Sequence, residues 1–257
     1  MKSLVKKIAL SNLGIKLRNF FNFKPIYMNT NHLYNNCSVS DSFCWRTDNN
    51  YETIFKYSDI LGLFYKIKKS YVELSFFSKN NQLLKTLVID ELDYSNELII
   101  NKKFLNGTED YGVFYIHHYT DIEIKDPTII SNRCYIGFSK NGCLHSYMHG
   151  NSLVRVKDLK GKKEGLSDIV KTSFFNNNVY RIQNFFDDLT STELFFSNPT
   201  YKDIIFYIES DKYTLKKGEC LIINTNKKNI INIKSNCFFL RPIIFNYKDQ
   251  FIDVYHG

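Results

Sequence analysis

Residues 133–150 read RCYIGFSKNGCLHSYMHG, and residues 241–257, which close the chain, read RPIIFNYKDQFIDVYHG. When one deleted residue is allowed for, the second stretch is an abbreviated copy of the first. The matched positions are Arg133 with Arg241, Ile136 with Ile244, Lys140 with Lys248, Asn141 with Asp249, and His149-Gly150 with His256-Gly257. Self-similarity along a chain is the signature of a repeated structural unit, so we interpret the pair as an internal duplication.

The repeated stretch alternates as a β-strand does. Cys134, Ile136 and Phe138 form an apolar row, and Arg133 and Tyr135 fall on the opposite face. Similar segments separated by Asn-rich turns predict strands at 71–77, 83–89, 96–101, 111–119, 179–186, 192–198, 203–210, 219–225, 229–235 and 237–247. A second echo, ELSFFSKN at 73–80 and ELFFSNPT at 193–200, is spaced more widely than the first. The difference in spacing implies that the first copy is longer, and we assign its extra residues to a loop at 120–132.

These patterns predict an all-β fold of tandem duplicated antiparallel β-sandwich units with an N-terminal amphipathic helix. Residues 1–36 form a basic N-terminal segment and linker, and residues 37–156 form the first sandwich. The charged, glycine-containing stretch 157–178 is the expected connector, and residues 179–257 form the second sandwich.

The net charge of +8 is concentrated at one end of the chain. Residues 1–40 contain no acidic residue and six cations, Lys2, Lys6, Lys7, Lys16, Arg18 and Lys24. The remainder therefore carries only about +2, the difference between 8 and 6. A nucleic-acid-binding domain spreads its cations over a face of the fold, so we expect no nucleic-acid partner.

The basic end also has the spacing of an amphipathic helix. Leu10, Leu13, Leu17, Phe20 and Phe21 follow one helical face. No run reaches the roughly 20 apolar residues that cross a bilayer. Two interpretations stay open: residues 2–24 bind an anionic membrane surface, or the helix docks on the body of the protein.

The six cysteines show neither a C-x-x-C pair nor a zinc-type spacing. Free, reduced thiols are typical of intracellular proteins. We therefore expect a cytoplasmic protein, peripheral at the inner membrane if the N-terminal segment binds lipid, with no bound metal. The sequence also lacks a phosphate-binding glycine loop, a nucleophile elbow and a dinucleotide fingerprint, so no cofactor is expected.

The stretch SDSFCWRTDNN contains the only tryptophan, Trp45, beside Arg46. An aromatic plane next to a guanidinium and carboxylates could present a sugar with a stacking surface and paired hydrogen bonds. The alternative is structural: Trp45 anchors the core, and Arg46 forms an ion pair with Asp48. The sequence does not decide between the two.

The histidines supply the candidate site. His145, Tyr147 and His149 share one face of an extended strand, where a His could act as a general base. His117 and His118 are adjacent, so only one of them can face a given site. The catalytic candidates are His145, His149 and His118, and the ligand-binding candidates are Trp45, Arg46, His117, Arg133, Tyr147 and Asn151. In the competing interpretation these side chains bond backbone carbonyls at the seam between the repeats.

Five motifs together carry a resemblance. They are SDSFCWRTDNNYETIF, YGVFYIHHY, RCYIGFS, SYMHGN and LRPIIFNYKDQFIDVYHG. In this combination the chain resembles a family of poorly characterised bacterial proteins encoded in surface-polysaccharide biosynthesis clusters, for capsule or lipopolysaccharide. The resemblance covers most of the chain after about residue 36. It implies a biosynthetic context and does not identify any catalytic residue.

Two functions are consistent with these observations. The first is a cytoplasmic protein of bacterial surface-glycan biosynthesis that binds, and in one version also modifies, a sugar, sugar nucleotide or lipid-linked glycan. The second is a non-catalytic scaffold that organises a membrane-associated complex, with glycosyltransferases as partners, through sheet edges and the N-terminal helix. Whether the protein is an enzyme is left open by the sequence.

Overall fold

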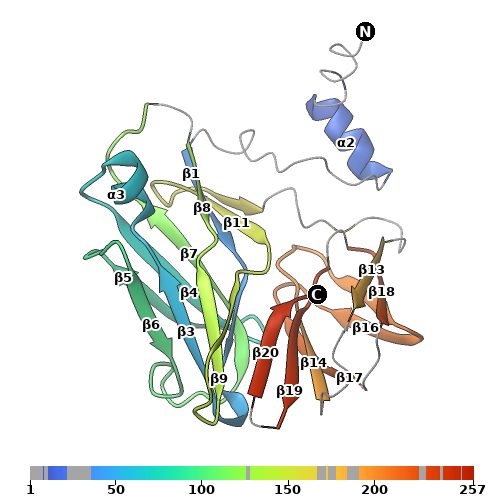
Figure 1. Ribbon diagram of the computed structural model, residues 1–257. Coiled ribbons are helices and arrows are strands. Elements are labelled where there is room, and N and C mark those ends of the chain that lie inside the picture. The colour runs from blue at the N-terminus through green and yellow to red at the C-terminus, as the bar shows by residue number, and fades with distance from the viewer. Residues whose placement is uncertain are drawn as a thin grey trace.

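The computed structural model confirms the all-β fold (Figure 1). It describes residues 8, 11–21, 36–125, 128–166, 172, 178–183, 191–225, 230–237, 240–249 and 251–257. The strands are β1 (Asn36–Asp41), β2 (Phe43–Arg46), β3 (Tyr51–Tyr57), β4 (Tyr71–Ser78), β5 (Leu83–Ile89), β6 (Asn96–Ile100), β7 (Tyr111–Tyr119), β8 (Thr128–Asn132), β9 (Tyr135–Lys140), β10 (Ser146–His149), β11 (Leu153–Asp158), β12 (Glu164–Leu166), β13 (Asn178–Gln183), β14 (Ser191–Ser197), β15 (Ile204–Ile208), β16 (Asp211–Leu215), β17 (Cys220–Thr225), β18 (Ile230–Ser235), β19 (Ile243–Lys248) and β20 (Phe251–His256). The helices are α2 (Asn12–Phe20), α3 (Ile60–Tyr65) and the short η1 (Asp48–Asn50).

Four of the five sheets form two matching pairs. In the first unit, sheet I has the order β2-β7-β4-β5 and sheet II the order β10-β9-β3-β6. In the second unit, sheet III has the order β13-β18-β15-β16 and sheet IV the order β20-β19-β14-β17. Taken in chain order, each strand of sheets I and II has a counterpart in sheets III and IV. The topology therefore repeats strand for strand, as the sequence echo predicts.

The two echoed stretches form hairpins with the same register. In β9–β10, Tyr135 pairs with His149 and Ile136 with Met148. In β19–β20, Ile243 pairs with His256 and Ile244 with Tyr255. The single deletion in the second copy therefore falls in the turn and leaves every cross-strand pair aligned, which preserves the side-chain faces.

The second sequence echo is misleading. ELSFFSKN lies in β4, which pairs with β5 and β7, whereas ELFFSNPT lies in β14, which pairs with β17 and β19. The counterpart of β14 is β3, because each is the inner neighbour of the repeated hairpin. The alignment of these two apolar runs was therefore wrong: both encode buried strands, and buried strands share composition without sharing position.

A fifth sheet stands outside the repeat. Its order is β12-β11-β1-β8, and β1 pairs with β8 in parallel, unlike the antiparallel pairs that we expected throughout. Part of the predicted loop 120–132 is therefore strand β8. The predicted connector, 157–178, begins inside β11 and contains β12, and its residues 167–171 and 173–177 lie outside the described residues.

Strand β1 continues into β2 but changes sheet at Ser42. The hydroxyls of Ser38 and Ser40 accept hydrogen bonds from the backbone N–H groups of His118 and Ile116 in β7. Strand β2 pairs with β7 only as far as Phe114, so these hydroxyls satisfy donors that would otherwise be buried without a partner. Strand β1 thereby covers the edge of β7 beyond the end of β2, and Arg155 and Lys157 of β11 lie over the rings of Tyr115 and Tyr119. Strand β7 is buried along almost its whole length.

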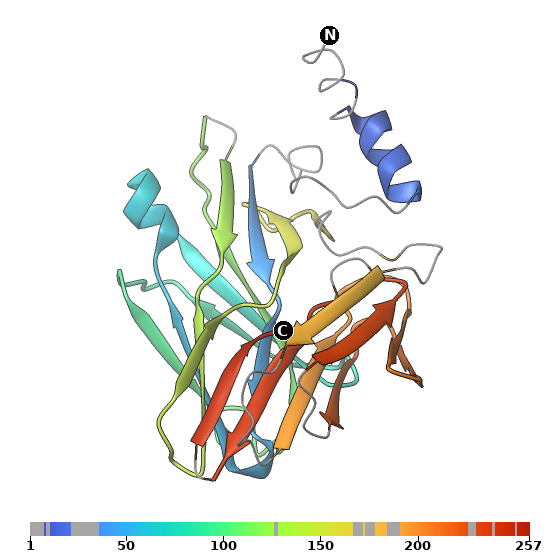
Figure 2. The ribbon, with the colours of Figure 1, turned by 45° about the vertical axis from the view of Figure 1, so that its right-hand side comes forward.

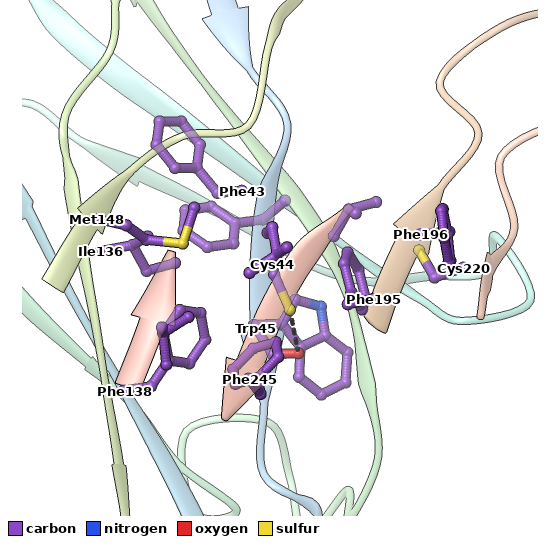
Figure 3. Packing of buried hydrophobic residues seen from close by; sticks show 14 of the residues in the cluster. Phe43, Cys44, Trp45, Ile136, Phe138, Met148, Phe195, Phe196, Cys220 and Phe245 are labelled. Atoms are coloured by element: carbon purple, nitrogen blue, oxygen red, sulfur yellow. Dashed lines mark hydrogen bonds between the residues drawn. The ribbon is translucent and has the colours of Figure 1, made fainter. Parts of the chain in front are cut away.

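One continuous hydrophobic core joins the two units. Phe43, Phe55 and Phe114 fill the space between sheets I and II, with ring centroids 4.8–5.2 Å apart. In the second unit, Phe196 packs on Phe206 between sheets III and IV. Figure 3 shows side chains of both units in one cluster, and the Phe245 ring of β19 lies 5.0 Å from the Phe138 ring of β9.

The units pack asymmetrically. By register, the counterparts of Lys56, Gly137 and Tyr147 are Phe195, Phe245 and Val254. The three residues of the second unit are buried, and the rings of Phe195 and Phe245 contact rings of the first unit. One face of sheet IV therefore packs against the first unit, whereas the equivalent face of sheet II is open to solvent.

A buried arginine connects the units. Arg46 is 1% exposed, and its guanidinium makes two hydrogen bonds to Asp48, of 3.0 and 2.7 Å. Its Nη1 also donates to Glu193 of β14 at 2.5 Å. The rings of Tyr51 and Phe245 lie 4.0 and 4.8 Å from the guanidinium carbon. Carboxylates and aromatic faces from both units thus compensate one desolvated cation.

Replacing Arg46 should destabilise the whole protein. In Arg46→Met, Asp48 and Glu193 lose their partner while still largely buried, and we expect the free energy of unfolding to fall by about 3–5 kcal/mol. Urea denaturation measures this loss. Lys56→Met, which breaks the exposed Lys56–Glu97 pair, is the control and should cost less than about 1 kcal/mol. Equal effects of the two substitutions would contradict the assignment.

Candidate functional site

The open face of sheet II carries a row of polar and aromatic side chains. We call it the outer face, because it lies opposite the buried Phe55, Phe138 and Met148. Cross-strand pairing aligns Glu97, Lys56, Tyr135 and His149 in one row, and Ile99, Ile54, Gly137 and Tyr147 in the next. The strands that fill the core with one set of side chains therefore present the alternate set to solvent.

Tyr147 lies across the sheet at Gly137. A Cβ atom at Gly137 would lie 2.5–2.9 Å from three atoms of the Tyr147 ring, so only glycine leaves room for the ring in this position. Tyr147 remains 43% exposed, and the Lys56 ammonium lies 5.1 Å from its ring centroid. The result is an accessible aromatic surface bordered by a cation.

The predicted row of His145, Tyr147 and His149 lies on this face. The ring centroids of His145 and Tyr147 are 6.0 Å apart, and the His149 ring lies 4.4 Å from that of Tyr135. His149 is exposed, and its Nδ1 is 3.2 Å from the carbonyl oxygen of Cys134. One backbone contact thus orients the ring and leaves its second nitrogen for other partners.

A pocket of about 480 Å³ lies at the end of the outer face. Its lining consists of Asn50, Tyr51, Glu52, Asn101, Lys102, Lys103, Ser139, Asn141 and Gly142. Inside it, Asn101 Nδ2 donates to Glu52 Oε2 at 3.5 Å, and Asn50 Nδ2 donates to Asn141 Oδ1 at 3.1 Å. Amides, a carboxylate and ammonium groups here offer both donors and acceptors to a hydroxyl-rich ligand.

Trp45 and Arg46 do not reach this site. Trp45 is fully buried, and its Nε1 donates to the carbonyl oxygen of Phe77 at 2.9 Å. Arg46 is held in the contact between the units. The core interpretation of both residues is therefore the one that the structure supports, and neither side chain is open to a ligand.

His117, His118 and Asn151 are also buried. His118 Nδ1 lies 2.5 Å from Asn132 Oδ1, and its Nε2 lies 3.0 Å from the carbonyl oxygen of Ser58. Burial lowers the pKa of His118, and it lowers that of His117 to about 3. Asn151 exchanges hydrogen bonds with Arg241 across the seam. These three candidates thus have structural surroundings, away from the outer face.

Arg133 lies beside a buried carboxylate. Its side chain is 53% exposed, and its Nε is 3.8 Å from Oδ2 of Asp41. Neither oxygen of Asp41 accepts a hydrogen bond within the described part of the chain. Burial raises the pKa of Asp41 to about 7, although the guanidiniums of Arg133 and Arg241 act to lower it. The two equivalent arginines of the repeat therefore meet at one carboxyl group, near the C-terminus that lies between the units (Figure 2).

Sequence reasoning missed part of the outer face. Lys56 and Gly137 contribute to it and are not among the predicted candidates, and Glu52 is predicted only as one of the carboxylates near Trp45 and Arg46. The alternation of YETIFKY at 51–57 could have identified Glu52 and Lys56 as neighbours on one face. Gly137 carries no local signal, because its role depends on a ring from another strand.

Two structural properties bear on the class of site. Within the described residues, no group of three or more His, Cys, Asp or Glu side chains could hold a metal ion. No helix of that same part of the chain has the length and apolar character to cross a membrane.

Comparison with known proteins adds no assignment. No protein-family model matches this chain, and no curated protein sequence matches it. The binding function is therefore argued from the geometry of the outer face.

The buried carboxyl gives a pH test. Asp41 has a pKa of 3.8 when unfolded and about 7 when folded, so the folded state binds its proton more tightly. The resulting stability is present at low pH and is lost as the pH rises towards 7. Between pH 4 and pH 7 we expect the free energy of unfolding of Asp41→Asn to rise relative to wild type, by up to about 4 kcal/mol.

Urea denaturation across this pH range measures the difference. Asp211→Asn, which changes an exposed aspartate, is the control. A difference between Asp41→Asn and wild type that stays constant with pH would show that Asp41 does not titrate in this range.

Proposed function

We propose that this protein binds a carbohydrate on the outer face of sheet II. The observation that carries the proposal is Tyr147, whose ring lies across the sheet at Gly137 and which as a residue is 43% exposed. An exposed aromatic plane offers an apolar surface with little conformational entropy to lose, and it suits the C–H surface of a sugar ring.

The surroundings of Tyr147 suit the rest of a sugar. His145, directly before β10, and His149, at the end of β10, are each two residues from Tyr147. Lys56 borders the ring, and the polar pocket with Glu52 continues the face. A few convergent polar groups around an apolar contact are typical of small-molecule sites. The proposal concerns binding, and the two histidines are the residues that would take part if the ligand is also modified.

The biological setting is proposed from two features of the chain: the family resemblance of its motifs and the state of its thiols. The motifs resemble proteins encoded with surface-polysaccharide biosynthesis genes, and none of the six cysteines forms a disulfide bond in the described part of the chain. We propose a cytoplasmic role in surface-glycan assembly, with a sugar, sugar nucleotide or lipid-linked glycan as ligand.

Removing the aromatic plane should remove binding. In a thermal-shift screen against nucleotide sugars and oligosaccharides, a ligand should raise the melting temperature of the wild type. For the ligand so found, Tyr147→Ala should weaken affinity at least about 10-fold, or about 1.4 kcal/mol, by isothermal titration calorimetry. Tyr201→Ala, an exposed tyrosine of the second unit, is the control.

Gly137→Ala supplies an independent check. It should weaken binding in the wild type by displacing the ring, and it should have no further effect in Tyr147→Ala. An absence of binding by any sugar, or full affinity in Tyr147→Ala, would overturn the proposal.

The exposed face of α2 supports a second candidate function, that of a non-catalytic scaffold in a membrane-associated complex. Leu13, Leu17 and Phe20 are 69%, 50% and 69% exposed and share one helical face. The acid-free first 40 residues give this end a positive charge that complements anionic lipids. Residues 2–7, 9–10 and 22–24 of the predicted membrane-binding segment lie outside the described residues.

Vesicle flotation tests this second function. The wild type should float with vesicles that contain phosphatidylglycerol, and much less with pure phosphatidylcholine or at high salt. A variant with Leu13→Glu, Leu17→Glu and Phe20→Glu should stay at the bottom of the gradient. Phe64→Glu, which changes an exposed residue of α3, is the control. Unchanged flotation of the triple variant would exclude α2 as the anchor.

A further inference from the structure

A second pocket lies between the two units. It measures about 420 Å³ and lies where the turns of the repeated hairpins, β9–β10 and β19–β20, meet side by side at the lower end of the molecule (Figure 1). The first turn contributes Lys140, Asn141, Gly142 and Cys143, and the second hairpin contributes Tyr247, Asp249, Phe251 and Ile252. The pocket is thus built from equivalent parts of both repeats.

Lys140 is the cation of this pocket. Its ammonium lies 4.3 Å from the ring centroid of Tyr247 and 5.5 Å from that of Tyr51. Among the described residues, no carboxylate forms an ion pair with it. An ammonium held against two aromatic rings, without a carboxylate partner, is suited to receive a negatively charged ligand group.

The rest of the lining suits a sugar that carries such a group. Phe251 is 64% exposed at the rim and offers an apolar plane, and Asp249 and Asn141 offer acceptors to hydroxyl groups. Both hydroxyl-binding groups come from turn residues with positive φ, at 53° for Asn141 and 50° for Asp249. Asn and Asp tolerate this backbone better than most residues do, which explains their use at the two tips.

The two pockets are adjacent. Asn141 and Gly142 line both of them, so the pockets lie on the two sides of one turn. Gly137, beneath the Tyr147 ring, is four residues from Asn141 along β9, or about 13 Å at 3.3 Å per residue. An oligosaccharide of several units could therefore contact the Tyr147 ring, the Glu52 pocket and Lys140 together.

We propose that the ligand is an acidic glycan whose carboxylate or phosphate group is bound by Lys140. This inference rests on the proposed function, because it extends the same site across the turn into the second unit. Tyr147 provides the stacking surface for a sugar ring, the Glu52 pocket binds hydroxyl groups, and Lys140 selects for negative charge. The second repeat therefore contributes directly to recognition through Phe251 and Asp249.

Matched glycans test this selection. The probes are hexasaccharides of glucose, mannose or N-acetylglucosamine, each prepared in neutral form, with carboxylates at the primary hydroxyl position, and with phosphates there. Wild-type protein should bind one acidic form at least 10-fold more tightly than its neutral counterpart, by isothermal titration calorimetry. The tighter of the carboxylate and phosphate forms identifies the source of the charge.

Variants assign the selection to Lys140. Lys140→Gln should abolish the preference, so that the acidic and neutral forms bind with equal affinity, and Lys140→Arg should restore the preference. The control is Lys85→Gln, because Lys85 also lies over an aromatic ring, 3.9 Å from Phe104, but lines neither pocket. Circular dichroism confirms that each variant is folded.

The outcomes separate the two proposals. Equal binding of neutral and acidic hexasaccharides, with Tyr147→Ala still impaired, would overturn the acidic-glycan inference and keep the carbohydrate-binding function. A preference for acidic forms that survives in Lys140→Gln would also overturn it. No binding of any probe by the wild type would overturn both.

Discussion

The buried guanidinium of Arg46 constrains the whole arrangement. An isolated charge is very unfavourable in a protein interior, so Asp48, Glu193 and the rings of Tyr51 and Phe245 must stay around it. Glu193 and Phe245 belong to the second unit, so a shift of that unit would remove one carboxylate and one aromatic ring from the cation. Phe245 also contacts Tyr51 and Phe138 on the inner face of sheet II. The outer face of sheet II therefore remains open to solvent.

The duplication explains why only one copy offers a site. Both hairpins keep the same register, so the positions of Gly137 and Tyr147 recur at Phe245 and Val254. In the second copy these positions carry apolar residues that are buried against the first unit. The second repeat thus uses this face of its sheet to contact the first repeat, whereas the first repeat exposes the equivalent face to solvent. The pocket at Lys140 uses the remaining exposed part of both hairpins.

The sequence predicts the repeat because residues 241–257 match residues 133–150. It predicts the row of His145, Tyr147 and His149 because alternate residues of an extended strand share one face. It does not predict the burial of Trp45 and Arg46, since side-chain burial depends on partners more than a hundred residues away. Glu193, for example, is 147 residues from Arg46. Strand β8 is short and pairs in parallel with β1, so it lacks the hairpin signal that identifies β4 and β5. The sequence therefore predicts the histidine and tyrosine row of the site. The residues around that row are identified only from contacts between strands.

A nuclear magnetic resonance titration is the most direct test of whether the outer face of sheet II binds the glycan. Isotope-labelled protein would be titrated with the hexasaccharide that binds best, and backbone amide signals would be followed. We expect the signals of Gly137, Tyr147, Lys140 and Gly142 to shift together and to saturate at one ligand concentration. Shifts confined to sheet III, or to the buried strand β7, would contradict the assignment of the outer face of sheet II as the binding site.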